Sequence, residues 1–311
     1  MLRYRADLRT LGFIATYFAL VFIGWNIELP LVAQAFLFVA VCSFSWFCAV
    51  ITHNTIHCPM FRSRGLNRAM QVVLTQTYGH PVSTFVPGHN LSHHKFTQQP
   101  QDVMRTTKVR FSWNLLNLLL FFPTIAGSIM KGEREFVMTM RKQRPRWFRQ
   151  LLIEAAFLIG IMVALAFLDW RRFLVWWYLP HVWAAFGIVT INLLQHDGCD
   201  ADHAVNHSRN FTGRLFGWWT FNNGFHAIHH MKPSLHWSLT RAAHDELVAP
   251  HNHPELNQKS MAGHLFKTYI WPGKRLRYDG EPLVLPAITE DQSWVPGRDK
   301  GNVDFSYGAE L

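Results

Sequence analysis

Charged side chains are scarce in this chain of 311 residues. Asp, Glu, Lys and Arg together make up 16% of it, whereas about 25% is usual in a soluble domain. Hydrophobic residues account for 49%, with 25 Phe and 13 Trp among them. They come in blocks too long for a soluble core, so the composition favours a membrane protein over one or two soluble domains.

Cysteine is also scarce, and its spacing shows no disulfide framework. The four cysteines are Cys42, Cys48, Cys58 and Cys199, and no two of them form a CxxC pair. Nothing in this pattern suggests a disulfide-stabilised secreted protein. We expect all four thiols to be reduced and to act mainly as small hydrophobic side chains.

Four segments come close to the ~20 apolar residues that a membrane-spanning helix needs. They are residues 11–29, 31–51, 151–168 and 173–194. Pro30 marks a tight turn between the first two segments, and a short polar connection joins the last two. The pattern predicts two helical hairpins that are separated by a long polar stretch.

Two further stretches give a weaker signal. Residues 111–130 are apolar enough to span a membrane, but Asn114, Asn117 and Pro123 weaken the pattern. We therefore expect this stretch to be interfacial or re-entrant. Residues 69–86 are amphipathic, which is also typical of a helix in the plane of the interface.

The positive charge of the chain is unevenly distributed. The formal net charge is +10, for which nucleic-acid binding is one explanation and a cytoplasmic excess of Lys and Arg is the simpler one. Residues 131–149 are rich in Lys and Arg, whereas the connection around Pro30 has neither. The distribution predicts that both termini, residues 131–149 and the polar tail 274–311 are cytoplasmic.

Histidine, in contrast, is abundant, with 18 residues. His53 and His57 lie at the end of the second apolar segment, four residues apart, so a helix would project both from one face. In a second cluster, His89 and His93 share a face, while His94 is rotated by about 100° and can reach a different metal.

A third histidine cluster follows the last apolar segment. His226, His229 and His230 fall at i, i+3 and i+4, which is one continuous helix face. Asn192 and His196 are also four residues apart, where the fourth segment ends. For Asn192, a hydrogen bond between helices is an equally good interpretation.

The number of histidines indicates the kind of metal site. Neutral imidazoles suit Zn, Cu, Fe or Ni, and a zinc site usually closes with four ligands. A set of eight or nine is too large for one zinc and favours two first-row metals with open positions. Iron is the metal among these that can activate dioxygen, although the residues alone do not select it.

The surroundings of the histidines suggest a hydrogen-bond partner for them and bear on one alternative function. Metal-bound histidines usually donate their distal N–H to an oxygen, and we expect at least one of Asp197, Asp200 and Asp202 to accept such a bond. A histidine-rich metal transporter would place its ligands near the bilayer midplane. The clusters here lie at the ends of the apolar segments, which disfavours a transporter.

Three motifs resemble the histidine boxes of the membrane fatty acid desaturase superfamily. They are HNTIH (53–57), HNLSHH (89–94) and HAIHH (226–230), and the resemblance runs from about Ser43 to Phe266. The stretches 222–225 and 233–237 are similar to bacterial members. The resemblance implies an all-α integral membrane protein with four transmembrane helices in two hairpins. A cytosolic helical cap would hold a di-iron centre, and residues 1–311 would form one domain.

The resemblance also implies a ligand set for two Fe ions that cycle between Fe²⁺ and Fe³⁺, with O2 as co-substrate. The metal ligands would be His53, His57, His89, His93, His94, His196, His226, His229 and His230, with Asn192 as a weaker tenth that acts through water. The histidine boxes vary within the superfamily and do not specify the product.

The activity implied is the oxygen-dependent desaturation of a fatty-acyl or other lipid chain. A lipid hydroxylase and a terminal-alkene-forming fatty acid decarboxylase share the same pattern and remain alternatives. No fused electron carrier is evident, so we expect a separate ferredoxin-, rubredoxin- or cytochrome-type donor with its reductase. The expected location is a bacterial cytoplasmic (inner) membrane, among membrane lipids and with no nucleic-acid partner.

Overall fold

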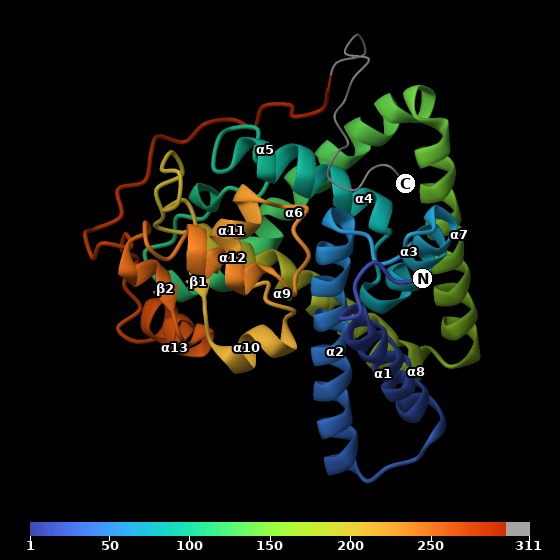
Figure 1. Ribbon diagram of the computed structural model, residues 1–311. Helices are drawn as coiled ribbons and strands as arrows, with labels where there is room; N and C mark the ends of the chain where they lie inside the picture. The colour runs from blue at the N-terminus through green and yellow to red at the C-terminus, as the bar shows by residue number, and fades with distance from the viewer. Residues whose placement is uncertain (297–311) are drawn as a thin grey trace. The chain divides into compact units, whose positions relative to one another are not determined.

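The computed structural model describes residues 1–296, and these are mostly helical (Figure 1). The longer helices are α1 (Asp7–Asn26), α2 (Leu31–His57), α3 (Arg64–Tyr78), α6 (Asn114–Gln143), α7 (Pro145–Leu168) and α9 (Leu179–His196). The shorter α-helices are α4 (Val82–Val86), α5 (His94–Phe96), α8 (Trp170–Phe173), α10 (Arg214–Trp219), α11 (His226–Met231), α12 (Thr240–Leu247) and α13 (Met261–Leu265).

Several short elements complete the fold. Three π-helices are η1 (Pro87–His93), η3 (Leu174–Tyr178) and η5 (Phe266–Ile270), and two 3-10 helices are η2 (Thr106–Lys108) and η4 (Pro254–Leu256). Strands β1 (Asn210–Phe211) and β2 (Asn257–Gln258) pair in parallel, with Asn210 opposite Asn257. This small sheet ties the segment before the third histidine cluster to a later loop.

Five helices in the described part of the chain are long and apolar enough to cross a membrane. They are α1, α2, α6, α7 and the run Trp170–His196. The fifth candidate, α6, covers the segment that we expected at the interface, so the predicted count of four is not confirmed. Its weakening residues Asn114 and Asn117 are buried, and Asn117 Nδ2 donates to the carbonyl oxygen of Phe111 at 2.9 Å.

The described chain divides into two compact units. The first comprises Met1–Val86 and Val137–Ile188, and the second comprises Pro87–Phe136 and residues 189–296. Helices α6 and α9 therefore contribute to both units. The chain enters the second unit directly before the second histidine cluster and again near the end of α9.

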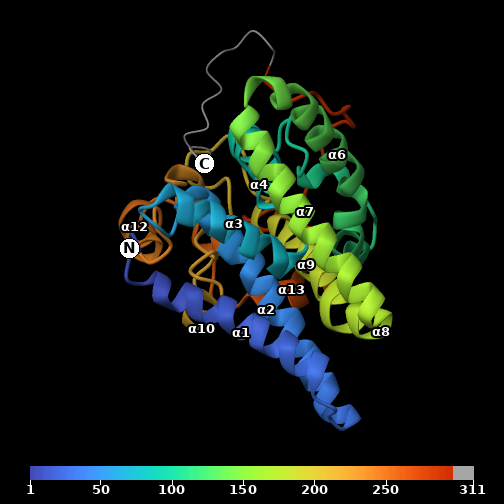
Figure 2. The same cartoon turned by 90° about the vertical axis from the view of Figure 1, so that its right-hand side faces the viewer.

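The first unit is built on long helices. Helix α1 runs beside α2, and α3 packs on α2 and α7 (Figure 2). Helix α3 begins where the Ser63 hydroxyl accepts a bond from the Leu66 N–H. It ends at Gly79, whose φ of 76° favours glycine. Helix α3 and the following α4 together overlap the predicted amphipathic region 69–86.

A buried carboxylate fixes α4 to α7 inside this unit. Glu154 is fully buried and accepts bonds from the Ser83 N–H at 2.8 Å and the Ser83 hydroxyl at 3.0 Å. Gln150 Nε2 donates to the same carboxylate at 2.9 Å. Helix α4 continues directly along the chain into η1, which carries His89 and His93.

The second unit contains a compact apolar core. Side chains from α6, α9, β1 and η5 meet there, and the buried members are Val109, Leu118, Phe121, Ile125, Leu193, Leu194, Phe211 and Tyr269. A smaller cluster packs under α11 and α12 and includes Phe225, Ile228 and Val248. These two clusters support the elements that carry the histidines.

The polar tail packs on the second unit as far as it is described. Arg275 Nε donates to Asp197 Oδ2 at 2.8 Å. Asp291 receives bonds from Arg105 Nη1 at 2.6 Å and Lys108 Nζ at 2.9 Å. Ion pairs therefore hold residues 275 and 291 of the tail against the rest of the second unit. Residues 297–311 lie outside the described part.

Candidate metal site

Seven of the nine predicted histidine ligands belong to the second unit. Three short elements and one long helix carry them. His89 and His93 lie on η1, and His94 begins α5. His196 ends α9, and α11 carries the third cluster (Figure 1). The π-helical turn of η1 is wider than an α-turn, and such turns are frequent at functional sites.

Four of these histidines form one group, which we name the four-histidine group. Its members are His93, His196, His226 and His230, whose ligand atoms all lie within 4.8 Å of one another. The Nε2 atom of His226 lies 2.9 Å from that of His196 and 3.1 Å from that of His230. His93 Nε2 is buried and has no hydrogen-bond partner within residues 1–296.

The outer contacts of this group fix which ring nitrogens face inward. His93 Nδ1 lies 3.0 Å from Asp102 Oδ2, and both side chains are fully buried. His196 Nδ1 donates to the carbonyl oxygen of His207 at 3.0 Å. An imidazole that donates through Nδ1 presents a lone pair at Nε2. The inward-facing nitrogens of His93 and His196 are therefore acceptors.

This arrangement fits a bound cation. Lone pairs held about 3 Å apart repel each other unless a cation lies between them. Two nitrogens bound at about 2.0–2.1 Å to one metal, at right angles, would be about 2.9 Å apart. Burial, and then the neighbouring histidines, lower the pKa of His226 and His230 well below the usual value. These rings are therefore neutral, as metal ligands must be.

A second gathering in the same unit is the three-histidine group, formed by His89, His94 and His229. The Nε2 atom of His94 lies 3.0 Å from Nε2 of His89 and 3.0 Å from Nε2 of His229. The rings of His94 and His230 stack with centroids 4.3 Å apart. The two groups are therefore neighbours, and adjacent residues His93 and His94 serve different groups, as predicted.

The first histidine cluster lies in the first unit. His53 and His57 are both buried in the last two turns of α2. Their ring centroids are 5.2 Å apart, which confirms that the i, i+4 spacing places them together. His53 Nδ1 donates to Asn54 Oδ1 at 3.2 Å. That this pair joins the histidines of the second unit stays a prediction.

Two predictions about the surrounding polar residues have different outcomes. Asn192 Nδ2 donates to the carbonyl oxygen of Met104 at 2.9 Å, and its role towards a metal stays a prediction. The expectation that Asp197, Asp200 or Asp202 orients a histidine is wrong within the described residues. Asp197 accepts from Arg275 through both carboxylate oxygens, and Asp200 accepts from the Asp202 N–H.

The carboxylate that does contact a candidate ligand is Asp102, which sequence reasoning missed. Asp102 lies nine residues after His93, whereas the acidic residues expected to orient a histidine all follow the last apolar segment. The polar stretch directly after the second cluster, which contains Asp102, is the sequence feature that could have indicated this partner. The four thiols are free, as predicted.

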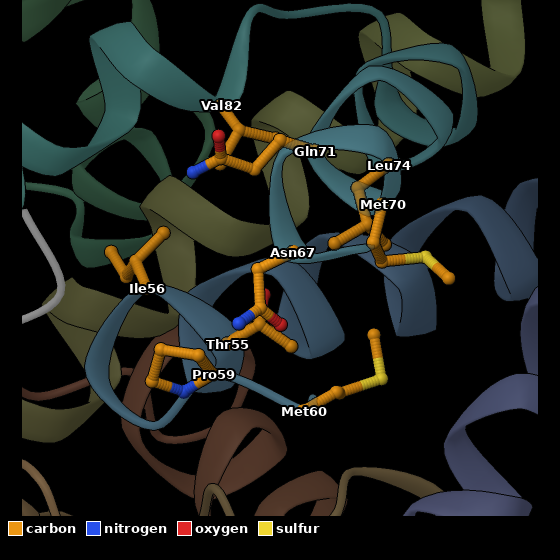
Figure 3. A pocket seen from close by; sticks show the side chains of 9 residues that line it. All are labelled: Thr55, Ile56, Pro59, Met60, Asn67, Met70, Gln71, Leu74 and Val82. Carbon is orange, nitrogen blue, oxygen red and sulfur yellow. The ribbon is translucent and has the colours of Figure 1, made fainter. Parts of the chain in front are cut away.

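A small pocket opens beside the first histidine cluster, inside the first unit (Figure 3). Thr55 and Ile56, which separate His53 from His57, contribute to its lining. The other lining residues are Pro59, Met60, Asn67, Met70, Gln71, Leu74 and Val82. Most of this lining is apolar, and Gln71 Oε1 is buried without a hydrogen-bond partner in the described chain.

Comparison with known proteins gives one match. The model of the family described as fatty acid desaturase matches residues 28–258. No curated protein and no solved structure matches the chain. The matched range includes every histidine described above and four of the five candidate membrane helices in whole or in part.

Proposed function

The chain belongs to the fatty acid desaturase family, and on that premise we propose that it inserts a double bond into a fatty-acyl chain with O2. The family implies a lipid substrate and an oxidoreductase reaction, and the apolar helices indicate a membrane protein. The observation that carries the proposal is the convergence of seven imidazoles in two neighbouring groups, with His89, His93, His196 and His226 buried.

We propose that the two groups hold one Fe ion each. The four-histidine group supplies His93, His196, His226 and His230. His53 and His57 complete the three-histidine group, and Asn192 acts through a water molecule. Imidazole ligands suit iron among other first-row metals. This chain supplies the cage, which explains why so many polar rings are buried in one region.

The reaction is balanced by two electrons from outside the chain. A –CH2–CH2– segment, O2, two protons and two electrons give –CH=CH– and two molecules of water. The iron pair supplies the dioxygen chemistry when bound. The protein residues hold the ligand nitrogens, keep them neutral and shield the site from bulk water. The apolar pocket beside Ile56 offers surface suited to part of the lipid chain.

The proposed setting follows from the charge distribution. Both termini and the basic residues 131–149 face the cytoplasm of a bacterial cell, in its inner membrane. The basic residues suit an acidic electron donor of the ferredoxin, rubredoxin or cytochrome type. Within this setting, the interleaved units form one domain, since neither is a continuous segment of the chain.

Product analysis tests the proposal directly. The full chain is expressed in membranes with a reductase system and supplied with lipids, and the products are identified by mass spectrometry. A product lighter by two hydrogens supports desaturation. Added oxygen would replace the proposal with hydroxylation, and loss of the carboxyl carbon would replace it with decarboxylation.

Metal analysis of the purified protein is the complementary measurement. About two iron ions per chain are expected in fully loaded protein. Zinc in their place would contradict the di-iron proposal. The variant His251→Ala changes a histidine on the exposed surface. It is the matched control for substitution of a ligand histidine such as His226, and it should keep both the metal and the activity.

A further inference from the structure

The Asp102 carboxylate is held at one fixed place by three hydrogen bonds. Its Oδ2 atom lies 3.0 Å from His93 Nδ1 and accepts from the Gln98 N–H at 2.9 Å. Its Oδ1 atom accepts from the Met104 N–H at 2.8 Å. The side chain is fully buried. Both carboxylate oxygens thus accept hydrogen bonds, which fix the carboxylate beside the His93 ring.

The loop that presents this carboxylate, residues 97–106, is folded tightly around it. Gln98 has a φ of 64°, a left-handed backbone that costs a non-glycine residue about 1 kcal/mol or more. The Gln98 Oε1 atom accepts from both the N–H and the hydroxyl of Thr106 at 2.9 Å. The strained residue is thus fixed by its own side chain, and its N–H points at Asp102.

The same loop is joined to the helix that carries the ligands. The Ser92 hydroxyl donates to the carbonyl oxygen of Gln101 at 2.7 Å and accepts from the Val103 N–H at 3.0 Å. The Thr97 hydroxyl donates to the carbonyl oxygen of His93 at 2.9 Å. Asp102 therefore cannot shift without moving η1, and the ring orientation of His93 depends on this loop.

On the far side of the loop, the tail provides a second attachment that does not contact His93. Arg105 Nη1 donates to Asp291 at 2.6 Å and to the carbonyl oxygen of Pro100 at 3.0 Å. Its other terminal nitrogen donates to the carbonyl oxygen of Thr289 at 2.7 Å. The order of the loop and the charge beside His93 can therefore be changed by separate substitutions.

We propose that Asp102 is a positioning residue that strengthens metal binding at the four-histidine group through His93. This proposal rests on the proposed function, which supplies the metal. It adds Asp102 as a residue that tunes how tightly the four-histidine group binds that metal. The carboxylate accepts the Nδ1–H of His93, which fixes the tautomer, orients Nε2 inward and makes that nitrogen a stronger donor. In the same group, His196 donates to a backbone carbonyl oxygen and not to a carboxylate. The Asp102 carboxylate therefore acts on the metal affinity of the group through His93.

Cobalt(II) titration of the full chain in detergent is the test. The metal-free protein is titrated against a competing chelator, and the visible absorption of bound Co²⁺ is recorded. The wild type should bind about two Co²⁺ ions. Asp102→Asn, which keeps the shape and removes the charge, should weaken one of the two by about 10- to 100-fold. Asp102→Glu, which keeps the charge one methylene further out, should fall between them.

Asp291→Asn is the matched control, because it removes the charge of one tail attachment of the loop, at Arg105, and leaves the Asp102–His93 contact intact. It should bind Co²⁺ like the wild type. Equal weakening in Asp291→Asn and Asp102→Asn would overturn the proposal, because loop order alone would then explain the effect. Wild-type binding in Asp102→Asn would also overturn it.

Two other outcomes also have a definite interpretation. If Asp102→Asn does not accumulate, Asp102→Glu carries the test, and wild-type Co²⁺ affinity and absorption in that variant would overturn the proposal. The readout needs no turnover. A chain that binds two Co²⁺ ions with the expected Asp102 dependence but yields no desaturated product would refute the proposed reaction and leave this inference in place.

Discussion

Helix α7 of the first unit and the packed core of the second unit place their apolar side chains in opposite ways. In α7, only 17% of the most apolar window is buried, and Phe157 and Phe167 are 56% and 88% exposed. In the core of the second unit, Phe121 and Phe211 are fully buried. A helix with an exposed apolar surface requires lipid around it, whereas these core side chains are covered by protein.

The largest effect is expected where the second unit concentrates its polar residues. His226→Ala removes a nitrogen that lies within 3.1 Å of two other ligand atoms. Desaturase activity should fall below about 1% of wild type, because losing a ligand costs more than the 10- to 100-fold typical of an outer partner. Product yield and metal content per chain measure it. The variant should still reach the membrane, and substantial activity would remove His226 from the ligand set.

A matched pair of phenylalanines tests the comparison itself. Phe121→Ala should destabilise the protein by about 3–5 kcal/mol, because it leaves a cavity in a packed core. Phe157→Ala should cost much less, since its ring is largely exposed on α7. Thermal unfolding of both variants in the same detergent gives the difference. Equal losses would mean that α7 packs against protein at this position, contrary to the lipid-facing interpretation.

Glu154 tests the exception to the pattern, a buried carboxylate within an apolar helix. Glu154→Ala leaves the Ser83 N–H and hydroxyl without their acceptor, which should cost about 1–3 kcal/mol. Glu154→Gln keeps an acceptor oxygen and should cost less. Thermal unfolding in detergent measures both. If Ala and Gln were equally tolerated, the anchor between α4 and α7 would be unimportant for stability.

The smallest effect concerns pH and the second unit alone. Burial lowers the pKa of His264 from 6.5 to about 3, so the unfolded chain takes up a proton below pH 6.5 and the folded chain does not. Stability should therefore fall as the pH drops from 6.5 towards 3, by about 2 kcal/mol at pH 5 from this residue. His264→Gln should show a shallower fall in unfolding temperature between pH 7 and 5. Parallel curves for variant and wild type would contradict this.

Regular spacing explains what the sequence could predict. Long apolar runs located α1, α2, α7 and the run that ends at His196, because helix length in a membrane is set by bilayer thickness. The i, i+4 spacing predicted that His53 and His57 lie together. The i, i+3 and i+4 spacings predicted that the three histidines of α11 share one helix face. They also separated His93 from His94, because helix rotation per residue is fixed. Such local periodicities need no knowledge of the tertiary fold.

Contacts that depend on irregular backbone could not be predicted in this way. Asp102 reaches His93 because Gln98 turns the chain with a positive φ, and no periodicity encodes such a turn. The attachment of Asp291 to Arg105 joins residues 186 positions apart. The apolar pattern of helix α6 was weak for a related reason, since its asparagines find partners only in the folded protein.

The interleaving of the units constrains how the protein can be made. His93 is synthesised long before His230, and α6, α7 and the run Trp170–His196 lie between them. The four-histidine group therefore closes only after the final apolar helix and α11 have left the ribosome. A chain halted partway through synthesis lacks the complete four-histidine group, so a metal ion bound by this group would be captured only after α11 has been made.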